Sequence, residues 1–362
     1  MPIPPKRKKL SPTVADVATA AGVGKATAAR ALGRYGQVSA KVREKVFATA
    51  ENLGYRPNEL ARSMTTGRSG TIGVVVGDIE NPFFSVAVRG IADVAQQSGF
   101  TVVVANSGEE IDAEREAVQT LLSKRVDGMI VTPCRSRDIG HLEEVVRAGV
   151  PLVLMDRAVP ELEVDTVTAN DREAAIEATQ LLLRLGHRRI AYVTACDTPK
   201  GRGFVESDIH ITSVRERIDG FLHICREAGV VNPEERVIVG ANNPVETHAL
   251  VETLLKSENP PSAILASDSQ VGLTIFEVVR DLGKSIPQDL SLITFHNADW
   301  TRVTSPPVTV IDQPVYQLGS TAASLMNSRL LGNQEPPSRI VLPSTLLERG
   351  SAGQLSIRHQ MD

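Results

Sequence analysis

The N-terminal part of the chain has the three- and four-residue spacing of short amphipathic helices. One face of the first predicted helix consists of small or apolar residues: Val14, Val17, Ala18 and Ala21. Gly22 permits a tight turn, after which a second amphipathic run turns Ala28, Ala31 and Leu32 inward. Its outward positions are small, polar or cationic: Gly24, Lys25, Thr27 and Arg30. This pattern favours a helix-turn-helix that enters the major groove of DNA; the alternative is an ordinary helical hairpin in a globular core.

Two further segments follow before the pattern changes. Ser39 is expected to cap a third helix that ends at Gly54. The predicted buried face of this helix carries apolar residues at helical spacing: Val42, Val46, Ala50 and Leu53. Pro57 fits the first position of a short helix over residues 58–64, followed by a flexible connection. Such a short helix would form only against a partner and DNA, so it is a candidate switch; the alternative is an inert linker.

From Thr71 onward, short apolar runs alternate with amphipathic stretches. The first series of apolar runs occupies 72–76, 101–105, 128–132 and 151–155, and the second 189–193, 236–240, 262–266 and 291–295. Helices are expected to begin near Phe84, Asp112 and Asp138, and to cover 171–185, 213–229, 245–257 and 269–282. This alternation predicts two doubly wound lobes with parallel sheets. The last segments, 308–312, 314–331 and 339–343, are expected to tie the lobes together.

Charge divides the chain at the same place as the hydrophobic pattern. Through Met64 there are 12 Lys or Arg against four Asp or Glu, a net charge of +8. Because the whole chain of 362 residues carries −4, the remainder carries −12. A basic head on an acidic body is typical of a nucleic-acid-binding protein. Residues 1–11 are expected to form a basic arm that adds phosphate contacts.

Composition excludes several other classes of protein. No apolar run approaches the roughly 20 residues of a membrane span, and the charged start lacks a secretory signal, so a cytoplasmic protein without membrane contact is expected. The three cysteines, Cys134, Cys196 and Cys225, are expected to be reduced thiols. The sequence has no Walker loop, no GxGxxG after a strand, no GxSxG and no metal-spaced His cluster, which argues against an enzyme, a catalytic residue, a metal site or a cofactor.

Several motifs, in this order along the chain, resemble the lactose-repressor (LacI/GalR) family of bacterial transcription regulators. They are TVADVATAAGV from Thr13, YRPNELARS, DIENPFF, LGHRRIAY, RERIDGF, IPQDLSLITF and SPPVTVIDQP. The resemblance implies a small all-α helix-turn-helix head (12–56), a hinge helix and linker (57–70), and a periplasmic-binding-protein-like α/β body of two lobes (71–343). Residues 344–362 are expected to form a C-terminal tail. A sugar-binding transport protein would have a similar body, but the basic head argues against that alternative.

The resemblance further implies a homodimeric repressor that binds operator DNA and is controlled by a small, carbohydrate-derived effector held between the lobes; the alternative is an activator or a corepressor-type regulator. Expected DNA contacts are Thr13, Gly24, Lys25, Ala26, Thr27, Arg30, Asn58, Arg62 and Met64. Lys25 and Ala26 stand where family members discriminate bases, and Met64 stands where they usually carry an intercalating Leu. Family members usually have Ser at Gly24, so the usual N-cap of the recognition helix is missing.

Ligands of doubly wound sheets bind beyond the carboxyl ends of the strands, where several polar residues stand. The expected effector contacts are Asp78, Phe83, Phe84, Ser213, Arg217, Asn242, Asp268 and His296. Arg217 matches a family arginine that clamps the ligand, and Ser213 lies one helical turn earlier on the same face. For Phe84 core packing is an equal explanation, and Asp78 would bond a hydroxyl or merely cap the next turn.

His296 departs from the family, which usually has Asp at this position. A histidine can donate to an anion and can change charge near neutral pH, so one hypothesis is an anionic effector such as a sugar acid or a sugar phosphate. The alternative is a neutral histidine that bonds a hydroxyl, as Asp would.

Overall fold

The computed structural model describes residues 12–33, 36–55, 68–196 and 203–355. The chain divides into two compact units, Met1–Gly70 and Thr71–Asp362. In the first unit the structure describes three helices: α1 (Val14–Ala21), α2 (Lys25–Gly33) and α3 (Ala40–Asn52). Their shared core is made of small residues: Val17, Ala18, Ala21, Ala28, Ala31, Val46 and Ala50. The predicted inward faces of the first two helices are thus confirmed.

Both ends of α1 are fixed by side chains or by backbone geometry. The Thr13 hydroxyl accepts a hydrogen bond from the Asp16 N–H (3.3 Å), and the Thr13 N–H donates to the Asp16 carboxylate (2.8 Å). This capping box satisfies two amide groups that the helix leaves free. At the other end Gly22 adopts the left-handed conformation (φ 63°), which confirms the predicted turn.

The third helix differs from the prediction at both ends. Ser39 occupies the N-cap position, but its side chain makes no capping hydrogen bond. Leu53, expected in the core, is 39% exposed. The reason is a Schellman turn, in which the Gly54 N–H donates to the Glu51 carbonyl and the Tyr55 N–H donates to the Ala50 carbonyl. The turn brings Tyr55 against the core in place of Leu53.

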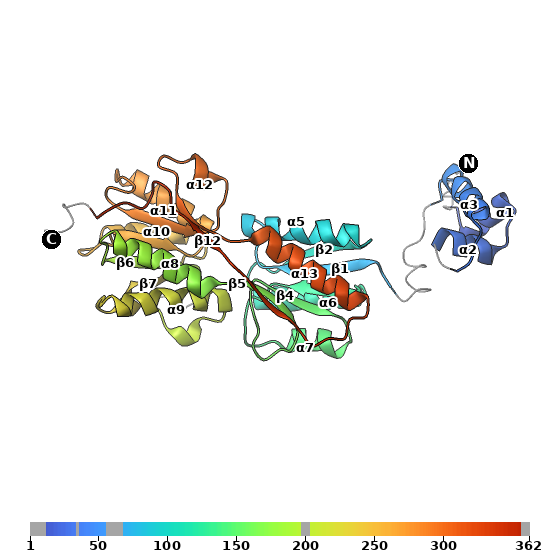
Figure 1. Ribbon diagram of the computed structural model, residues 1–362, viewed down its shortest axis with the longest axis horizontal. Coiled ribbons are helices and arrows are strands. Elements are labelled where there is room, and N and C mark those ends of the chain that lie inside the picture. Colours follow the sequence, from blue (N-terminus) through green and yellow to red (C-terminus); the bar gives the residue numbers. More distant parts are fainter. Residues whose placement is uncertain (1–11, 34–35, 56–67, 197–202, 356–362) are drawn as a thin grey trace, which may run out of the picture. The chain divides into compact units, whose positions relative to one another are not determined.

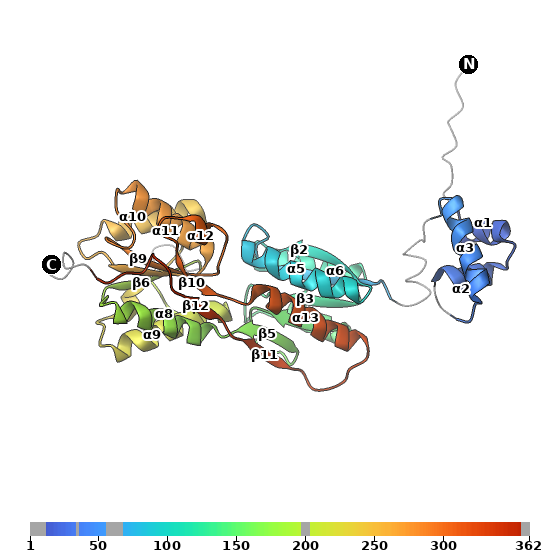
Figure 2. The same ribbon diagram turned by 45° about the horizontal axis from the view of Figure 1, so that its top comes forward.

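The second unit contains two six-stranded sheets, each covered by helices on both faces (Figures 1 and 2). In the first sheet the strand order is β11-β5-β4-β3-β1-β2, and every pair is parallel. Its strands are β1 (Thr71–Val76), β2 (Thr101–Asn106), β3 (Gly128–Val131), β4 (Leu152–Met155), β5 (Asp165–Ala169) and β11 (Arg339–Leu342). Its helices are α5 (Pro82–Gln97), α6 (Ile111–Ser123), α7 (Gly140–Arg147) and α13 (Val315–Leu330).

The second sheet repeats this plan with the order β12-β10-β9-β8-β6-β7. Its strands are β6 (Ile190–Thr194), β7 (Val237–Val239), β8 (Ala263–Ala266), β9 (Ser291–Phe295), β10 (Thr309–Asp312) and β12 (Thr345–Leu347). Its helices are α8 (Asp171–Arg184), α9 (Thr212–Glu227), α10 (Pro244–Leu255), α11 (Ser269–Asp281) and the short α12 (Trp300–Val303). All pairs are parallel except β10 with β12. Two doubly wound lobes are therefore confirmed.

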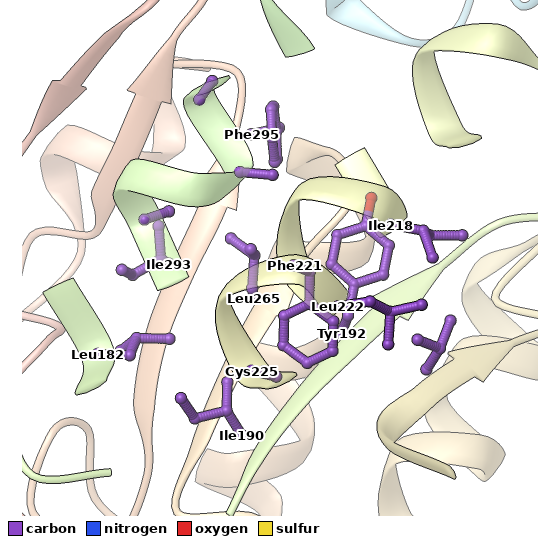
Figure 3. Packing of buried hydrophobic residues seen from close by; sticks show 14 of the residues in the cluster. Leu182, Ile190, Tyr192, Ile218, Phe221, Leu222, Cys225, Leu265, Ile293 and Phe295 are labelled. Carbon is purple, nitrogen blue, oxygen red and sulfur yellow. The ribbon is translucent and has the colours of Figure 1, made fainter. Parts of the chain in front are cut away.

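Helix packing in each lobe is close. Helix α13 lies along α5, and a Cβ atom added at Gly90 of α5 would come within 2.3 Å of the Tyr316 carbonyl oxygen. In the second lobe α8 and α9 cover one face of the sheet, and Figure 3 shows Tyr192 of β6 beside Phe221 of α9, with ring centroids 5.8 Å apart. Tyr192 is fully buried, and burial raises the pKa of its hydroxyl.

The chain crosses between the lobes three times, after β5, after β10 and after β11. Two of the crossings are tied together, because the Ser344 N–H donates to Asn170 Oδ1 (2.7 Å) and the Asn170 N–H donates to the Leu342 carbonyl (3.1 Å). The segments expected to join the lobes therefore do so.

The expected C-terminal tail from residue 344 is wrong for residues 344–355. Residues Thr345–Leu347 form β12, and Ser351 is fully buried, with its hydroxyl donating to the Leu292 carbonyl. The sequence pattern misses this strand because three residues are too few to show an alternation of polar and apolar positions.

Candidate ligand-binding site

A cavity of about 170 Å³ lies between the carboxyl ends of the strands of the two lobes. All eight residues that the sequence suggests as effector contacts line it: Asp78, Phe83, Phe84, Ser213, Arg217, Asn242, Asp268 and His296. Seven of these positions lie in the connection after a strand or in the first turn of the helix that follows it, as the topology of doubly wound sheets requires, and Arg217 lies one turn farther along α9. The structure thus brings together residues that are up to 218 positions apart in the sequence.

Two aromatic rings form part of the first-lobe wall. Phe83 and Phe84, at the start of α5, meet edge to face with centroids 5.3 Å apart. Both rings also belong to the apolar core of that lobe, so Phe84 packs and lines the cavity at once. Asp78 Oδ1 accepts from the Glu80 N–H (3.0 Å), which is the expected capping of the next turn, and the residue also borders the cavity.

The rest of that wall is a cluster of acidic and basic side chains that the sequence analysis does not predict as effector contacts. Arg157 is buried and donates through both terminal nitrogens to Glu109, at 2.6 and 2.8 Å. Gly77 makes room for this carboxylate, since a Cβ atom there would lie 2.1 Å from Glu109 Oε1. Asp156 is also buried, and burial raises the pKa of its carboxyl against the opposing charge of Arg157. Asp156 and Arg157 directly follow β4, so the strand-end rule that suggests Asp78 applies to them too.

The second-lobe wall centres on Arg217 of α9. Its Nε donates to Asp171 Oδ1 (2.7 Å), its Nη1 donates to the Ser267 carbonyl (2.7 Å), and its guanidinium lies 4.3 Å from the Phe295 ring centroid. Burial raises the pKa of Asp171 to about 7, although the charge of Arg217 opposes this rise. These contacts use two of the five N–H donors of Arg217, so three donors, on Nη1 and Nη2, remain for a ligand.

Asp268 and Asn242 follow β8 and β7, the strands on either side of β6. Asp268 caps α11, with its Oδ1 accepting from the Gln270 and Val271 N–H groups at 2.8 and 3.0 Å. Its other oxygen accepts from the Ser267 hydroxyl (2.9 Å). Asn242, beyond β7, is exposed at the cavity wall. The orientation of the Asp268 side chain is therefore fixed by its hydrogen bonds, whereas the exposed Asn242 side chain lies open to the cavity.

His296 occupies a position in the second lobe that corresponds to Asp156 in the first. Each is the first residue after a strand, each has a left-handed backbone (φ 69° and 68°), and each donates its N–H to the neighbouring strand. The His296 ring meets Phe83 of the other lobe edge to face, with centroids 5.9 Å apart. Burial lowers the pKa of His296, although Asp312 and Asp268 oppose this shift. The imidazole is therefore neutral at pH 7.

The expected DNA contacts of the first unit lie partly within the described residues. Thr13 caps α1, while Lys25 and Ala26 are exposed at the start of α2. The Gly24 carbonyl accepts from the Thr27 and Ala28 N–H groups, so Gly24 begins the helix without a capping side chain. Arg30 is exposed, and its Nε donates to the Ala26 carbonyl (3.2 Å). Asn58, Arg62 and Met64, and the basic arm, lie outside the described residues.

Comparisons with known proteins agree with this arrangement. Residues 13–58 match the family of "Bacterial regulatory proteins, lacI family", and residues 179–352 match the "Periplasmic binding protein-like domain". The chain is 32% identical over 338 residues to the ribose operon repressor of Halalkalibacterium halodurans, covering 93% of this chain and 96% of that protein. It is 30% identical over 339 residues to catabolite control protein A of Priestia megaterium, covering 94% and 98%.

Two solved structures extend the comparison to the whole fold. A transcriptional regulator CelR–cellobiose complex is 29% identical, with a TM-score of 0.68 over 94% of this chain and 99% of that chain. The lac repressor dimer bound to operator and the anti-inducer ONPF has a TM-score of 0.80 over 95% and 100%, at 24% identity.

Fold and relatives together define a DNA-binding transcriptional regulator with a periplasmic-binding-type body, a class of proteins that are not enzymes. The chain belongs to the lacI family of bacterial regulatory proteins. In the described part of the chain, none of the helices has the length and apolar character that crossing a membrane requires.

Proposed function

We propose that this regulator binds a neutral, hydroxyl-rich small molecule, a sugar or a sugar derivative, in the cavity between its lobes, and that occupancy changes its affinity for operator DNA. The effector binds one arrangement of the lobes more tightly than another and so shifts the population toward it. This shift changes the affinity of the DNA-binding head for the operator. Two relatives support a sugar, since one is a ribose operon repressor and the other, CelR, is in complex with cellobiose.

The observation that carries the proposal is the charge balance of the cavity. Its two guanidinium groups are already paired, Arg157 with Glu109 and Arg217 with Asp171, and His296 is neutral. Unlike a site for a sugar acid or a phosphate, this cavity offers no free positive charge. We therefore favour a neutral His296 that bonds a hydroxyl of the effector, and we do not favour an anionic effector.

The remaining groups fit hydroxyls and the face of a sugar ring. Asp78, Asp156 and Asp268 supply carboxylate acceptors, while Asn242 and Ser213 can both donate and accept. The two phenylalanine rings supply an apolar surface against which C–H groups of a ring can pack. We assign effector contact to all eight sequence-predicted residues and add Asp156, Arg157 and Glu109.

On the DNA side, we propose that the chain acts as a homodimeric repressor on a pseudopalindromic operator. The operator-bound lac repressor dimer, with the same fold, supports this assembly. The exposed Lys25 and Ala26 would face base edges, and Arg30 would meet phosphate. Replacing Lys25 with Ala should weaken operator binding and spare effector binding.

The direct test is thermal unfolding of the full chain against matched ligands. The panel pairs neutral sugars with their charged forms: D-glucose with gluconate and glucose 6-phosphate, and D-ribose with ribose 5-phosphate. A ligand at about 100 times its dissociation constant adds roughly 2.7 kcal/mol, which raises the unfolding temperature by several degrees. We expect a shift from a neutral sugar, lost in Phe83→Ala and kept in the surface control Val231→Ala. Shifts from charged forms alone would refute a neutral effector.

A further inference from the structure

One short segment of the second lobe contacts the first lobe beyond the ends of two strands. We call residues 210–212, which lead into α9, the bridging segment. The His210 carbonyl accepts from the N–H of Ser136, in the connection after β3 (2.8 Å). The Thr212 hydroxyl bonds Ala158, in the connection after β4. Because β3 and β4 pair with each other, the bridging segment joins the second lobe to two adjacent strand ends of the first.

The Thr212 hydroxyl makes two bonds to the same first-lobe residue. Its Oγ1 accepts from the Ala158 N–H (2.8 Å) and donates to the Ala158 carbonyl (3.2 Å). Thr212 is itself buried. Without this hydroxyl, closed lobes would leave both backbone groups of Ala158 without that partner, and water could reach them more easily once the lobes part. The hydroxyl therefore favours the closed arrangement of the lobes over an open one.

The bridging segment is fixed within its own lobe. Ile209, directly before it, is 1% exposed and belongs to the apolar core of the second lobe. The Ile209 carbonyl accepts from Arg215 Nη2 of α9 (2.6 Å). Ile211 has an extended backbone (φ −90°, ψ 119°) and packs against the same core. The bonds of this segment therefore join the two lobes themselves, and not a loose loop to one of them.

Two further contacts cross between the lobes near the end of β1. Gln270 Nε2 of α11 donates to the Glu80 carbonyl (3.3 Å), and the Phe83 and His296 rings meet edge to face. In the sheet order, β1 lies beside β3, and β3 lies beside β4. The lobes are thus joined at three consecutive strand ends. All of these contacts are made between protein groups, so they do not require an effector to form.

The Thr212–Ala158 pair lies beside the 170 Å³ cavity without forming its wall. Each member is followed or preceded in the chain by a residue that lines the cavity, Ser213 after Thr212 and Arg157 before Ala158. Neither member is among the lining residues in the described part of the chain. The pair can therefore set the distance between the two walls without contacting a ligand.

We propose that Thr212 is a positioning residue that holds the two lobes together before the effector binds, through its two bonds to Ala158. The walls of the cavity are then in place in advance, and the effector loses less free energy in ordering them. Opening is a hinge motion of the two lobes. The consequence for operator binding rests on the proposed function, whereas closure without an effector does not.

The experiment measures amide hydrogen exchange of the full chain, without added sugar, at single-residue resolution. The main reporter is the Ser136 N–H, because its partner is a backbone carbonyl that the substitution leaves in place. Lobe motions are fast compared with exchange, so the rate reports how much of the time the lobes are apart. In the wild type we expect the Ser136 and Ala158 amides to exchange more slowly than in an unstructured peptide, by about tenfold or more. Unprotected amides at both positions would overturn the inference.

Thr212→Val removes the hydroxyl and keeps the shape of the side chain. A neutral hydrogen bond changes an equilibrium constant by roughly two- to tenfold. We expect exchange at both Ser136 and Ala158 to become faster by this factor, while amides within β3 and β4 keep their rates. Thr212→Ser keeps the hydroxyl and should retain the wild-type rate at Ser136.

Thr179→Val is the matched control. Thr179 is also buried in the second lobe, but its hydroxyl donates to the Ala175 carbonyl of its own helix (2.7 Å), so neither reporter should change. Faster exchange at Ala158 alone in Thr212→Val would overturn the inference, because the hydroxyl would then act only locally.

If Thr212→Val does not fold, Thr212→Ala removes the same hydroxyl and repeats the test. The measurement contains no sugar, so a negative result leaves the proposed function standing. Conversely, a sugar panel without any thermal shift would leave the closure of the lobes standing.

Discussion

Two ion pairs between α8 and α9 have similar lengths but differ strongly in burial, so comparing them measures how much Arg217 supports the fold. The Arg217 Nε to Asp171 Oδ1 distance is 2.7 Å, and the two side chains are 9% and 0% exposed. The Arg172 Nε to Asp219 Oδ2 distance is 2.8 Å, and those side chains are 38% and 56% exposed. We predict that Arg217→Met strongly destabilises the body and that Arg172→Met does not.

The magnitude follows from what each substitution leaves behind. Removing one partner of a buried pair costs about 3–5 kcal/mol, because the other charge stays buried without compensation. An exposed pair contributes about 0–1 kcal/mol. Arg217→Met also leaves the Ser267 carbonyl without its donor and loses the contact with Phe295, which places the expected loss toward the upper end of that range.

The pH dependence gives a second signature of the same pair. Burial raises the pKa of Asp171 to about 7, so the folded state binds more protons than the unfolded state between about pH 4 and pH 7, and stability falls as the pH rises through this window. Without Arg217 the folded pKa of Asp171 rises further. The destabilisation by Arg217→Met should therefore grow from pH 6 to pH 8, because protonation relieves the buried charge only at the lower pH.

Urea unfolding of the full chain at several pH values, followed by circular dichroism, measures these effects. The double variant Arg217→Met with Asp171→Leu should recover most of the lost stability, because it removes both charges from the interior, but it should not recover effector binding. A loss below about 1 kcal/mol for Arg217→Met, equal to that for Arg172→Met, would refute the assignment of a buried, supporting pair.

Three further substitutions test separate parts of the structure. Thr13→Ala removes a capping hydroxyl and should lower the stability of the helical head by about 1 kcal/mol, seen as faster amide exchange in α1, whereas Thr19→Ala on the exposed face should not. Gly90→Ala places a Cβ atom 2.3 Å from a backbone oxygen of α13 and should lower the free energy of unfolding in urea by about 2 kcal/mol, as core overpacking does. Gly140→Ala, with no neighbour within 4 Å, should change this free energy by less than about 0.5 kcal/mol. His296→Asn should flatten the fall of stability below about pH 6.5, since the wild-type unfolded state takes up a proton that the buried imidazole, with its lowered pKa, does not; an identical pH profile would contradict the neutral imidazole.

The sequence predicts the lobes well because most strands are uninterrupted apolar runs. It misses β5, where Asp165 and Thr166 interrupt the pattern although both are buried. The Asp165 carboxylate is satisfied there by two hydrogen bonds from Arg329, at 2.6 and 2.9 Å. That partner lies 164 residues away, so no local pattern can indicate it.

The site shows the same division between local and distant information. Strand ends are visible in the sequence, and they indicate Asp78, Asn242, Asp268 and His296 correctly as residues around one cavity. The pairing of Arg157 with Glu109, 48 residues apart, depends on how β2 and β4 are placed in the sheet. The charge balance that favours a neutral effector therefore becomes visible only in three dimensions.

The most direct test of the central mechanism is the operator affinity of the full chain with and without its effector. A binding sequence is selected from a random DNA pool at fixed salt, and its dissociation constant is measured by fluorescence anisotropy with and without the sugar that gives the largest thermal shift. A regulator controlled from the cleft should select a pseudopalindromic sequence and change its affinity at least tenfold when the sugar is added, and Phe83→Ala should abolish that change. A selected operator whose affinity is the same with and without a bound sugar would contradict the mechanism.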